Sequence, residues 1–97
     1  MIHVYDTFVC KPGNAGKIAK QMKEAMEKQD GFVNILTDMT GQYHRVIMVS
    51  KYDSLTAYEK SFEKWSKPTP EMKKLNEKFA GMQEMYTTGS REIFKVW

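Results

Sequence analysis

The stretch GSREIFKVW, residues 89–97, alternates apolar and polar side chains along its length. Alternation with a period of two is typical of a β-strand. Residues 2–11, IHVYDTFVCK, show the same alternation near the other end of the chain. We therefore expect Arg91 to Trp97 to pair with Ile2 to Lys11 in one sheet.

Asn14 and Gly31 bracket the first predicted helix. Asn14 is a common N-cap residue, so we expect this helix over roughly 15–29. Gly31 suits the left-handed conformation that follows many helices. Two further alternating segments, 32–38 and 44–52, then predict a pair of strands joined by a slightly long turn.

Two later helices are predicted from stripes of large apolar residues at helical spacing. Asp53 and Ser54 can cap the first of them, and Pro68 and Pro70 interrupt the helix before a third resumes near Glu71. The apolar residues recur every three or four positions, as one buried helix face requires. They are Leu55, Tyr58, Phe62 and Trp65 in the second helix, and Met72, Leu75, Phe79 and Met82 in the third.

The expected order, β-α-β-β-α-α-β, is the α+β, ferredoxin-like arrangement, here as one domain over residues 1–97. Short connections place the first and third strands at the centre of a four-stranded antiparallel sheet and the last strand at an edge. The helices can cover only one face, yet both faces of the strands carry large apolar side chains. A second copy packed sheet to sheet is the simplest cover, so we expect a two-fold homodimer.

Composition narrows the partners and the location. Lys and Arg number 15 against 12 Asp and Glu, a formal charge of +3 that is scattered over helix faces, so we expect no nucleic-acid partner. The single cysteine, Cys10, cannot form an internal disulfide. The longest apolar run, 46–49, is far short of a membrane span, and the chain start has no signal-peptide layout. We expect a cytoplasmic protein without a membrane partner.

Several familiar motifs fail when their spacing is tested. GNAGK, residues 13–17, has two residues between its glycines where a phosphate-binding loop needs four. An RNA-recognition domain requires aromatic residues and a glycine in its central strands. The third strand of this chain has no aromatic residue at its centre and no glycine. The histidines are His3 and His44 alone; although neighbouring strands could bring them together, we expect no metal site.

Candidate site residues are the polar groups on the strands and the aromatic face of the second helix. A base that draws a proton from a substrate has three candidates, His44, His3 and Asp6. Asp6 interrupts an apolar row and needs a partner if it is buried, and Arg91 on the neighbouring strand could supply one. A pocket between helices and sheet is an alternative to plain core packing for the aromatic stripe. The candidates to line it are Tyr5, Asn34, Tyr58, Phe62, Trp65 and Arg91.

Three passages carry a resemblance to a known group of proteins. They are KPGNAGKIAKQM (11–22), VSKYDSLTAYEKSFEKW (49–65) and TGSREIFKVW (88–97). Together they resemble the dimeric α+β barrel superfamily, close to its antibiotic-biosynthesis-monooxygenase and NIPSNAP-like groups. The resemblance implies a homodimeric barrel. It also implies one possible function, cofactor-independent oxygenation of a small aromatic substrate. The alternative, non-catalytic binding of a small apolar ligand or a protein partner, is suggested by the lack of a convergent set of polar residues in the sequence.

Haem chemistry, which some of these relatives perform, is not expected here. Trp65 matches the tryptophan that haem-degrading relatives carry on the second helix. Those relatives also use an asparagine on the first strand and a nearby histidine. The first strand of this chain has no asparagine, and residues 64–85 contain no histidine. We therefore expect no prosthetic group.

Overall fold

The computed structural model describes residues 1–39, 44–79 and 81–97, without the side chain of Trp65. The predicted ferredoxin-like order is confirmed, with a short 3₁₀ helix, η1, added before the last strand. The predicted turn at 40–42 lies outside the described residues. The elements are β1 (Ile2–Cys10), α1 (Ala15–Met26), β2 (Phe32–Thr37), β3 (Arg45–Tyr52), α2 (Leu55–Ser66), α3 (Pro70–Lys78), η1 (Met82–Glu84) and β4 (Tyr86–Lys95).

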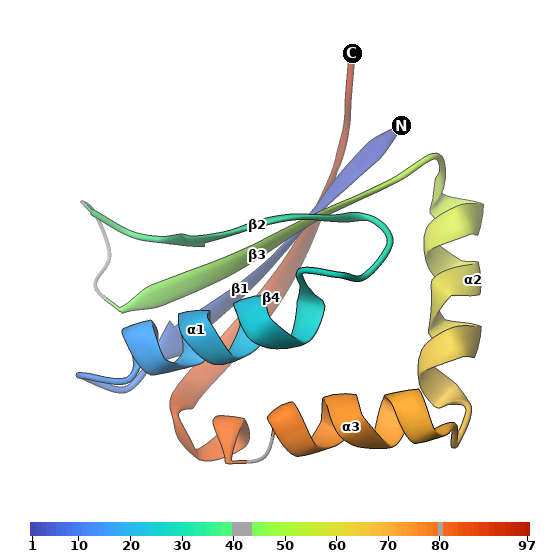
Figure 1. Ribbon diagram of the computed structural model, residues 1–97. Coiled ribbons are helices and arrows are strands. Elements are labelled where there is room, and N and C mark those ends of the chain that lie inside the picture. The colour runs from blue at the N-terminus through green and yellow to red at the C-terminus, as the bar shows by residue number, and fades with distance from the viewer. Residues whose placement is uncertain (40–43, 80) are drawn as a thin grey trace.

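The four strands form one antiparallel sheet in the order β2-β3-β1-β4, so β1 and β3 are central, as predicted. All helices lie on the same side of this sheet (Figure 1). The register places Asp6 of β1 between Met48 of β3 and Arg91 of β4. Because paired residues point to the same face of a sheet, these three side chains share one side.

The main core lies between α1 and the helix side of the sheet. Ile18 and Met22 of α1 are fully buried against Val46 of β3 and Cys10 of β1. A second, smaller cluster joins α1 to α3. Each large apolar side chain gains roughly 1.5–3 kcal/mol from full burial, so these contacts fix α1 and α3 below the sheet.

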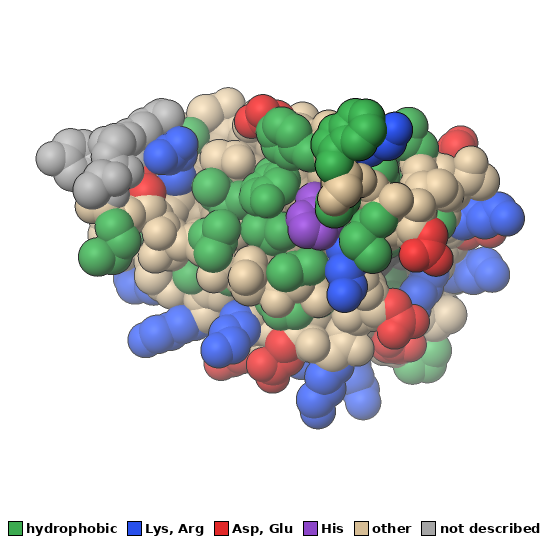
Figure 2. Space-filling view, turned by 90° about the horizontal axis from the view of Figure 1, so that it is seen from above, with side chains coloured by type: hydrophobic (Ala, Val, Ile, Leu, Met, Phe, Trp, Pro, Cys, Tyr) green, Lys and Arg blue, Asp and Glu red, His purple; other side chains and the backbone are tan. Residues whose placement is uncertain are grey.

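The other face of the sheet, here called the back face, has no helix over it. Leu36 of β2 is 42% exposed and Phe94 of β4 is 49% exposed. Tyr5 and Ile47, from the two central strands, are half-buried between them. Figure 2 looks onto this face and shows hydrophobic side chains gathered over its middle, with charged ones mostly toward its edges. The apolar pattern on both strand faces is therefore real.

Helix α1 begins at Ala15, as predicted, but ends earlier than expected. It ends at Met26, three residues before the expected end, and residues 27–31 turn back before β2. Gly31 does take the left-handed conformation, with φ of 86°. Asn14 stands at the N-cap position, but its side chain makes no capping hydrogen bond because its backbone is already near-helical.

Helix α2 is capped by Ser54, one of its two predicted caps, and α3 is capped by Thr69, which was not predicted. Ser54 Oγ accepts a hydrogen bond from the backbone N–H of Ala57 at 3.1 Å. Thr69 Oγ1 accepts one from the N–H of Met72 at 3.2 Å. The apolar stripe of α3 does not continue to Met82 as one helix, because α3 ends at Lys78 and Met82 begins η1.

Candidate functional site

A cavity of about 250 Å³ lies between the helix side of the sheet and the three helices. Helix α2 stands at one end of the sheet (Figure 1), and it contributes Tyr58, Ser61 and Phe62 to the cavity lining. Most of the cavity surface is apolar. Its lining residues are Asp6, Met26, Asp30, Phe32, Met48, Ser50, Tyr52, Tyr58, Ser61, Phe62, Phe79 and Arg91.

The polar centre of this cavity is an ion pair between neighbouring strands. Arg91 Nε donates a hydrogen bond to Asp6 Oδ1 at 2.5 Å. The Asp6 side chain is only 11% exposed, whereas that of Arg91 is 51% exposed. The hydrogen bond to Asp6 raises the pKa of Arg91 above its usual value, although burial acts in the opposite direction. A charge-assisted contact of this kind holds both groups in place.

Tyr58 of α2 brings a hydroxyl group to the same place. Its Oη is buried and has no hydrogen-bond partner of ordinary geometry among the described residues. Burial raises the pKa of Tyr58 above its ordinary value of 10.0, although the nearby Arg91 guanidinium acts in the opposite direction. The hydroxyl therefore keeps its proton at neutral pH and can donate it in a hydrogen bond.

Aromatic rings connect α2 to the sheet across the cavity. The Tyr58 ring lies 4.9 Å from the Tyr52 ring and 4.9 Å from the Phe62 ring, measured between centroids. The Arg91 guanidinium carbon is 5.7 Å from the centroids of both Tyr58 and Phe62. No residue of α2 with a described side chain is fully buried. This helix is therefore held mainly by contacts that also form the cavity wall.

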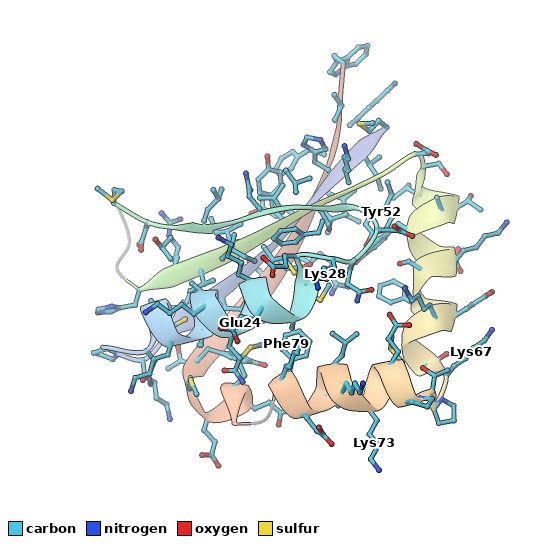
Figure 3. All side chains as sticks on the ribbon, viewed as in Figure 1. Glu24, Lys28, Tyr52, Lys67, Lys73 and Phe79 are labelled. Carbon is cyan, nitrogen blue, oxygen red and sulfur yellow. The ribbon has the colours of Figure 1, made fainter. Side chains whose placement is uncertain are left out.

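Phe79 closes the cavity from below. It follows the last residue of α3, and its ring rises toward α1 and the sheet, whereas Lys73 of the same helix points away (Figure 3). It packs beside both core clusters. Tyr52, also labelled in Figure 3, lines the cavity from the end of β3. The cavity thus lies between rings contributed by strands and by helices.

The sequence candidates fall on two different faces. Asp6, Tyr58, Phe62 and Arg91 line the cavity together. His3 and Tyr5 do not, because odd-numbered residues of β1 point to the back face. There they line a separate, open hollow of about 530 Å³ with residues such as Ile47 and Phe94.

Three more candidates lie away from the cavity or outside the description. Asn34 is exposed on β2 and pairs with Val49, whose side chain belongs to the back face. His44 precedes β3, and its backbone oxygen accepts a hydrogen bond from the N–H of Cys10 at 2.7 Å. The side chain of Trp65 is not described.

The two histidines lie near opposite ends of β1. His3 pairs with Lys51, while His44 is bonded to the backbone of Cys10. Seven residues of strand separate these positions, which is roughly 23 Å at the usual rise per residue. They cannot share a metal ion, and the described part of the chain holds no group of three His, Cys, Asp or Glu side chains suited to one.

Most of the residues that line the cavity were not among the candidates predicted from the sequence. Met48, Ser50 and Tyr52 alternate along β3 and pair with Asp6, Val4 and Ile2 of β1. Their shared parity was visible in the sequence, but the register that sets them beside Asp6 was not. Other residues were missed because they come from the ends of elements; these are Met26, Asp30, Phe32 and Phe79.

No helix among the described residues is long and apolar enough to cross a membrane. No model of a known protein family matches the chain. No curated protein matches its sequence.

Solved structures, in contrast, match nearly the whole chain. A NIPSNAP domain protein from Burkholderia xenovorans has a TM-score of 0.80 at 11% identity, covering 100% of this chain and 95% of its own. A NIPSNAP family protein of unknown function from Agrobacterium tumefaciens has a TM-score of 0.76 at 13% identity, covering 99% and 87%. An antibiotic biosynthesis monooxygenase has a TM-score of 0.62 at 10% identity, covering 100% and 99%. The expected resemblance is thus confirmed in the fold that these proteins share with this chain.

Proposed function

We propose that this protein binds a small, mainly apolar molecule in the cavity between its sheet and helices. One observation carries this proposal: an apolar cavity of about 250 Å³ contains, at one place, the Asp6–Arg91 pair and the Tyr58 hydroxyl. Apolar walls with a few convergent polar groups are the usual composition of a ligand site. The walls favour burial of the ligand, and the polar groups orient it.

The aromatic rings suit a ligand that is itself flat and aromatic. The Tyr58 ring already contacts the Tyr52 ring in a tilted arrangement and the Phe62 ring edge-on, each at a centroid distance of 4.9 Å. Rings at these separations add favourable contacts beyond simple burial. Met26 and Met48 complete the walls with flexible side chains that adapt to the outline of a ligand.

Oxygenation of the bound molecule is a second candidate function, favoured by the position of Asp6. Of the three candidate bases, Asp6 lines the cavity, whereas His3 and His44 do not. An antibiotic biosynthesis monooxygenase is among the similar structures, although the NIPSNAP structures have the higher TM-scores. Asp6 Oδ1 is occupied by Arg91, which leaves the carboxylate less suited to removing a proton. Binding without chemistry is therefore our first conclusion.

The protein that binds this ligand is, in our proposal, a homodimer formed through the back face. The exposed apolar side chains of Leu36, Phe94 and Val96 support this assembly. So does the uncovered hollow beside His3 and Tyr5. In such a dimer these residues would be interface residues, while the ligand cavity, on the other side of the sheet, would remain accessible in both copies.

A thermal-shift screen of small aromatic compounds tests the binding function. A ligand that binds the folded state raises the melting temperature by mass action. Ser61→Phe fills the cavity from α2 and should abolish the shifts, because Ser61 lines the cavity. Ser66→Phe is the matched control: both serines donate a hydrogen bond to the carbonyl oxygen three residues earlier, but Ser66 lies outside the cavity.

The proposal is wrong if no compound shifts the wild-type protein, or if Ser61→Phe responds like Ser66→Phe. If compounds do bind, measuring oxygen consumption in their presence distinguishes oxygenation from binding alone. Turnover that disappears in Asp6→Asn supports the oxygenase, and absence of turnover supports binding alone.

A further inference from the structure

We propose that the cavity selects an uncharged aromatic ligand whose carbonyl-type oxygen accepts a hydrogen bond from the Tyr58 hydroxyl. This inference rests on the proposed function and specifies the chemistry of that same site. Tyr58 becomes a residue that determines specificity, and a carboxylate of the same shape is excluded.

The Tyr58 hydroxyl is the polar group that the protein leaves unsatisfied at this site. Buried polar groups in proteins nearly always have a hydrogen-bond partner, and each exception calls for an explanation. Tyr58 Oη is buried and has no hydrogen-bond partner of ordinary geometry among the described residues, and the adjacent Arg91 guanidinium can only donate to it. It belongs to a side chain that lines the cavity, so a bound molecule can reach it.

The neighbouring Arg91 cannot supply what this hydroxyl needs. A guanidinium has only donors, so Arg91 can offer a proton to Tyr58 Oη but cannot accept one from it. Nε of Arg91 is already directed to Asp6. The O–H of Tyr58 and the remaining N–H groups of Arg91 are therefore donors at the same side of the cavity. Together they fit an acceptor oxygen on the ligand.

The charges around the cavity decide which acceptor is favoured. Two carboxylates, Asp6 and Asp30, line it together with one cation, Arg91. That cation is already paired with Asp6. A ligand carboxylate would lose its water without gaining a free positive charge, and burying an unpaired charge is costly. A ketone or ester carbonyl oxygen avoids this cost while still accepting a hydrogen bond from the Tyr58 hydroxyl.

The volume of the cavity limits the size of the ligand. Pockets for drug-sized molecules measure roughly 300–1,000 Å³. The cavity here is about 250 Å³, so it suits a molecule of one or two rings. Naphthalene derivatives are therefore appropriate probes, and they exist as matched neutral and charged forms.

Three probes with the same ring system test this selection. They are 2-acetylnaphthalene, which has a ketone oxygen, 2-naphthoate, which has a carboxylate, and 2-ethylnaphthalene, which has no acceptor. Isothermal titration calorimetry on the full chain should give the ketone a Kd roughly 3- to 10-fold lower than the hydrocarbon, as one net hydrogen bond allows. The naphthoate should bind at least about tenfold more weakly than the ketone.

Tyr58→Phe should remove the advantage of the ketone over the hydrocarbon. The variant should fold with an unchanged or higher Tm, because it loses a buried hydroxyl that has no acceptor. Tyr52→Phe is the matched control: its ring also lines the cavity and contacts Tyr58, and it should keep the preference for the ketone.

The outcomes separate this inference from the proposed function. Equal affinity for all three probes, or a preference for the ketone that survives in Tyr58→Phe, overturns the inference while the binding function stands. Tighter binding of the naphthoate overturns it as well. If none of the probes binds, the proposed function and this inference both fall.

Discussion

At the scale of single residues, the Asp6–Arg91 pair links two strands whose positions in the sequence are 85 residues apart. Sequence reasoning identified Arg91 as one possible partner of Asp6 because both lie on strands expected to pair. The structure shows that they are direct neighbours across β1 and β4. Because the Asp6 side chain is largely buried, replacing Arg91 leaves the Asp6 charge poorly compensated and should destabilise the fold.

Arg91→Gln should lower the free energy of unfolding by about 1–3 kcal/mol. This is less than for a fully buried pair because the Arg91 side chain is half-exposed and water screens its charge. Urea denaturation measures the loss. Asp6→Asn in the same chain should recover part of it, since the buried negative charge is then gone.

Lys64→Gln provides the comparison for this prediction. It breaks an ion pair with Glu71 whose side chains are 50% and 59% exposed, and it should change stability by less than about 0.5 kcal/mol. A loss for Arg91→Gln as small as that for Lys64→Gln would show that the Asp6 pair does not stabilise the sheet.

Cys10 should be unreactive in the folded protein. It is buried in the main core, and this burial, followed by the charge of Asp38, raises the pKa of its thiol above the ordinary 9.0. Since the thiolate is the reacting form, alkylation by iodoacetamide at pH 8 should be much slower than in the unfolded chain. Mass spectrometry after timed labelling measures this, and equal rates would contradict it.

The same shift predicts a pH dependence of stability. A raised pKa in the folded state means that the folded protein holds the proton more tightly than the unfolded chain. The protonated Cys10 thiol therefore contributes its full stabilisation of the folded state below about pH 9, and this contribution is lost as the pH rises through the raised pKa of Cys10. The stability difference between wild type and Cys10→Ala should therefore shrink above pH 9.

At the scale of elements, the sequence predicted type and order well and the ends of elements less well. Periodicity located every strand and the three main helices, because burial on one or two faces leaves a regular pattern. The first helix, however, ends at Met26 and not near residue 29. Its end depends on the local turn that leads to Gly31, and the apolar pattern contains no information about that turn.

Site prediction had a related limit, which was the choice of sheet face. The candidates included residues of both faces, since alternation along β1 does not tell which side meets the helices. Asp6 and Arg91 proved to lie on the helix side, and His3 and Tyr5 on the back face. Only the three-dimensional packing of the helices distinguishes these two sets.

Both Asn14 and Ser54 are typical N-cap residues in the sequence, but only the Ser54 side chain makes a capping hydrogen bond in the structure, so the two should differ in their effect on stability. Ser54→Ala should destabilise the protein by about 1 kcal/mol, because Ser54 Oγ accepts a hydrogen bond at the start of α2. Asn14→Ala should cost clearly less, because the Asn14 side chain makes no such bond. Thermal or urea unfolding of both variants measures the difference. An equal cost for the two would contradict the observed capping.

At the scale of the whole molecule, the back face makes the homodimer testable. Ile47 lies on β3 in the middle of that face, and Ile47→Glu would place a charge within the proposed interface. Sedimentation should show wild type as a dimer and this variant as a monomer, since an unpaired buried charge is strongly unfavourable.

Leu55→Glu is the matched control for dimerisation. Leu55 is 60% exposed but lies on α2, on the helix side of the sheet, so the variant should remain a dimer. A wild-type protein that sediments as a monomer at every concentration would contradict the proposed assembly, and the back face would then need another explanation.

The central position of β1 also affects how the protein is made. β1 is synthesised first, yet one of its two neighbours is β4, residues 86–95. During translation one edge of β1 must stay unpaired until residue 95 has left the ribosomal tunnel. Contacts so distant in sequence slow folding and leave an open edge exposed to other nascent chains. We therefore expect the growing chain to be most prone to association with other chains before β4 is available to pair with β1.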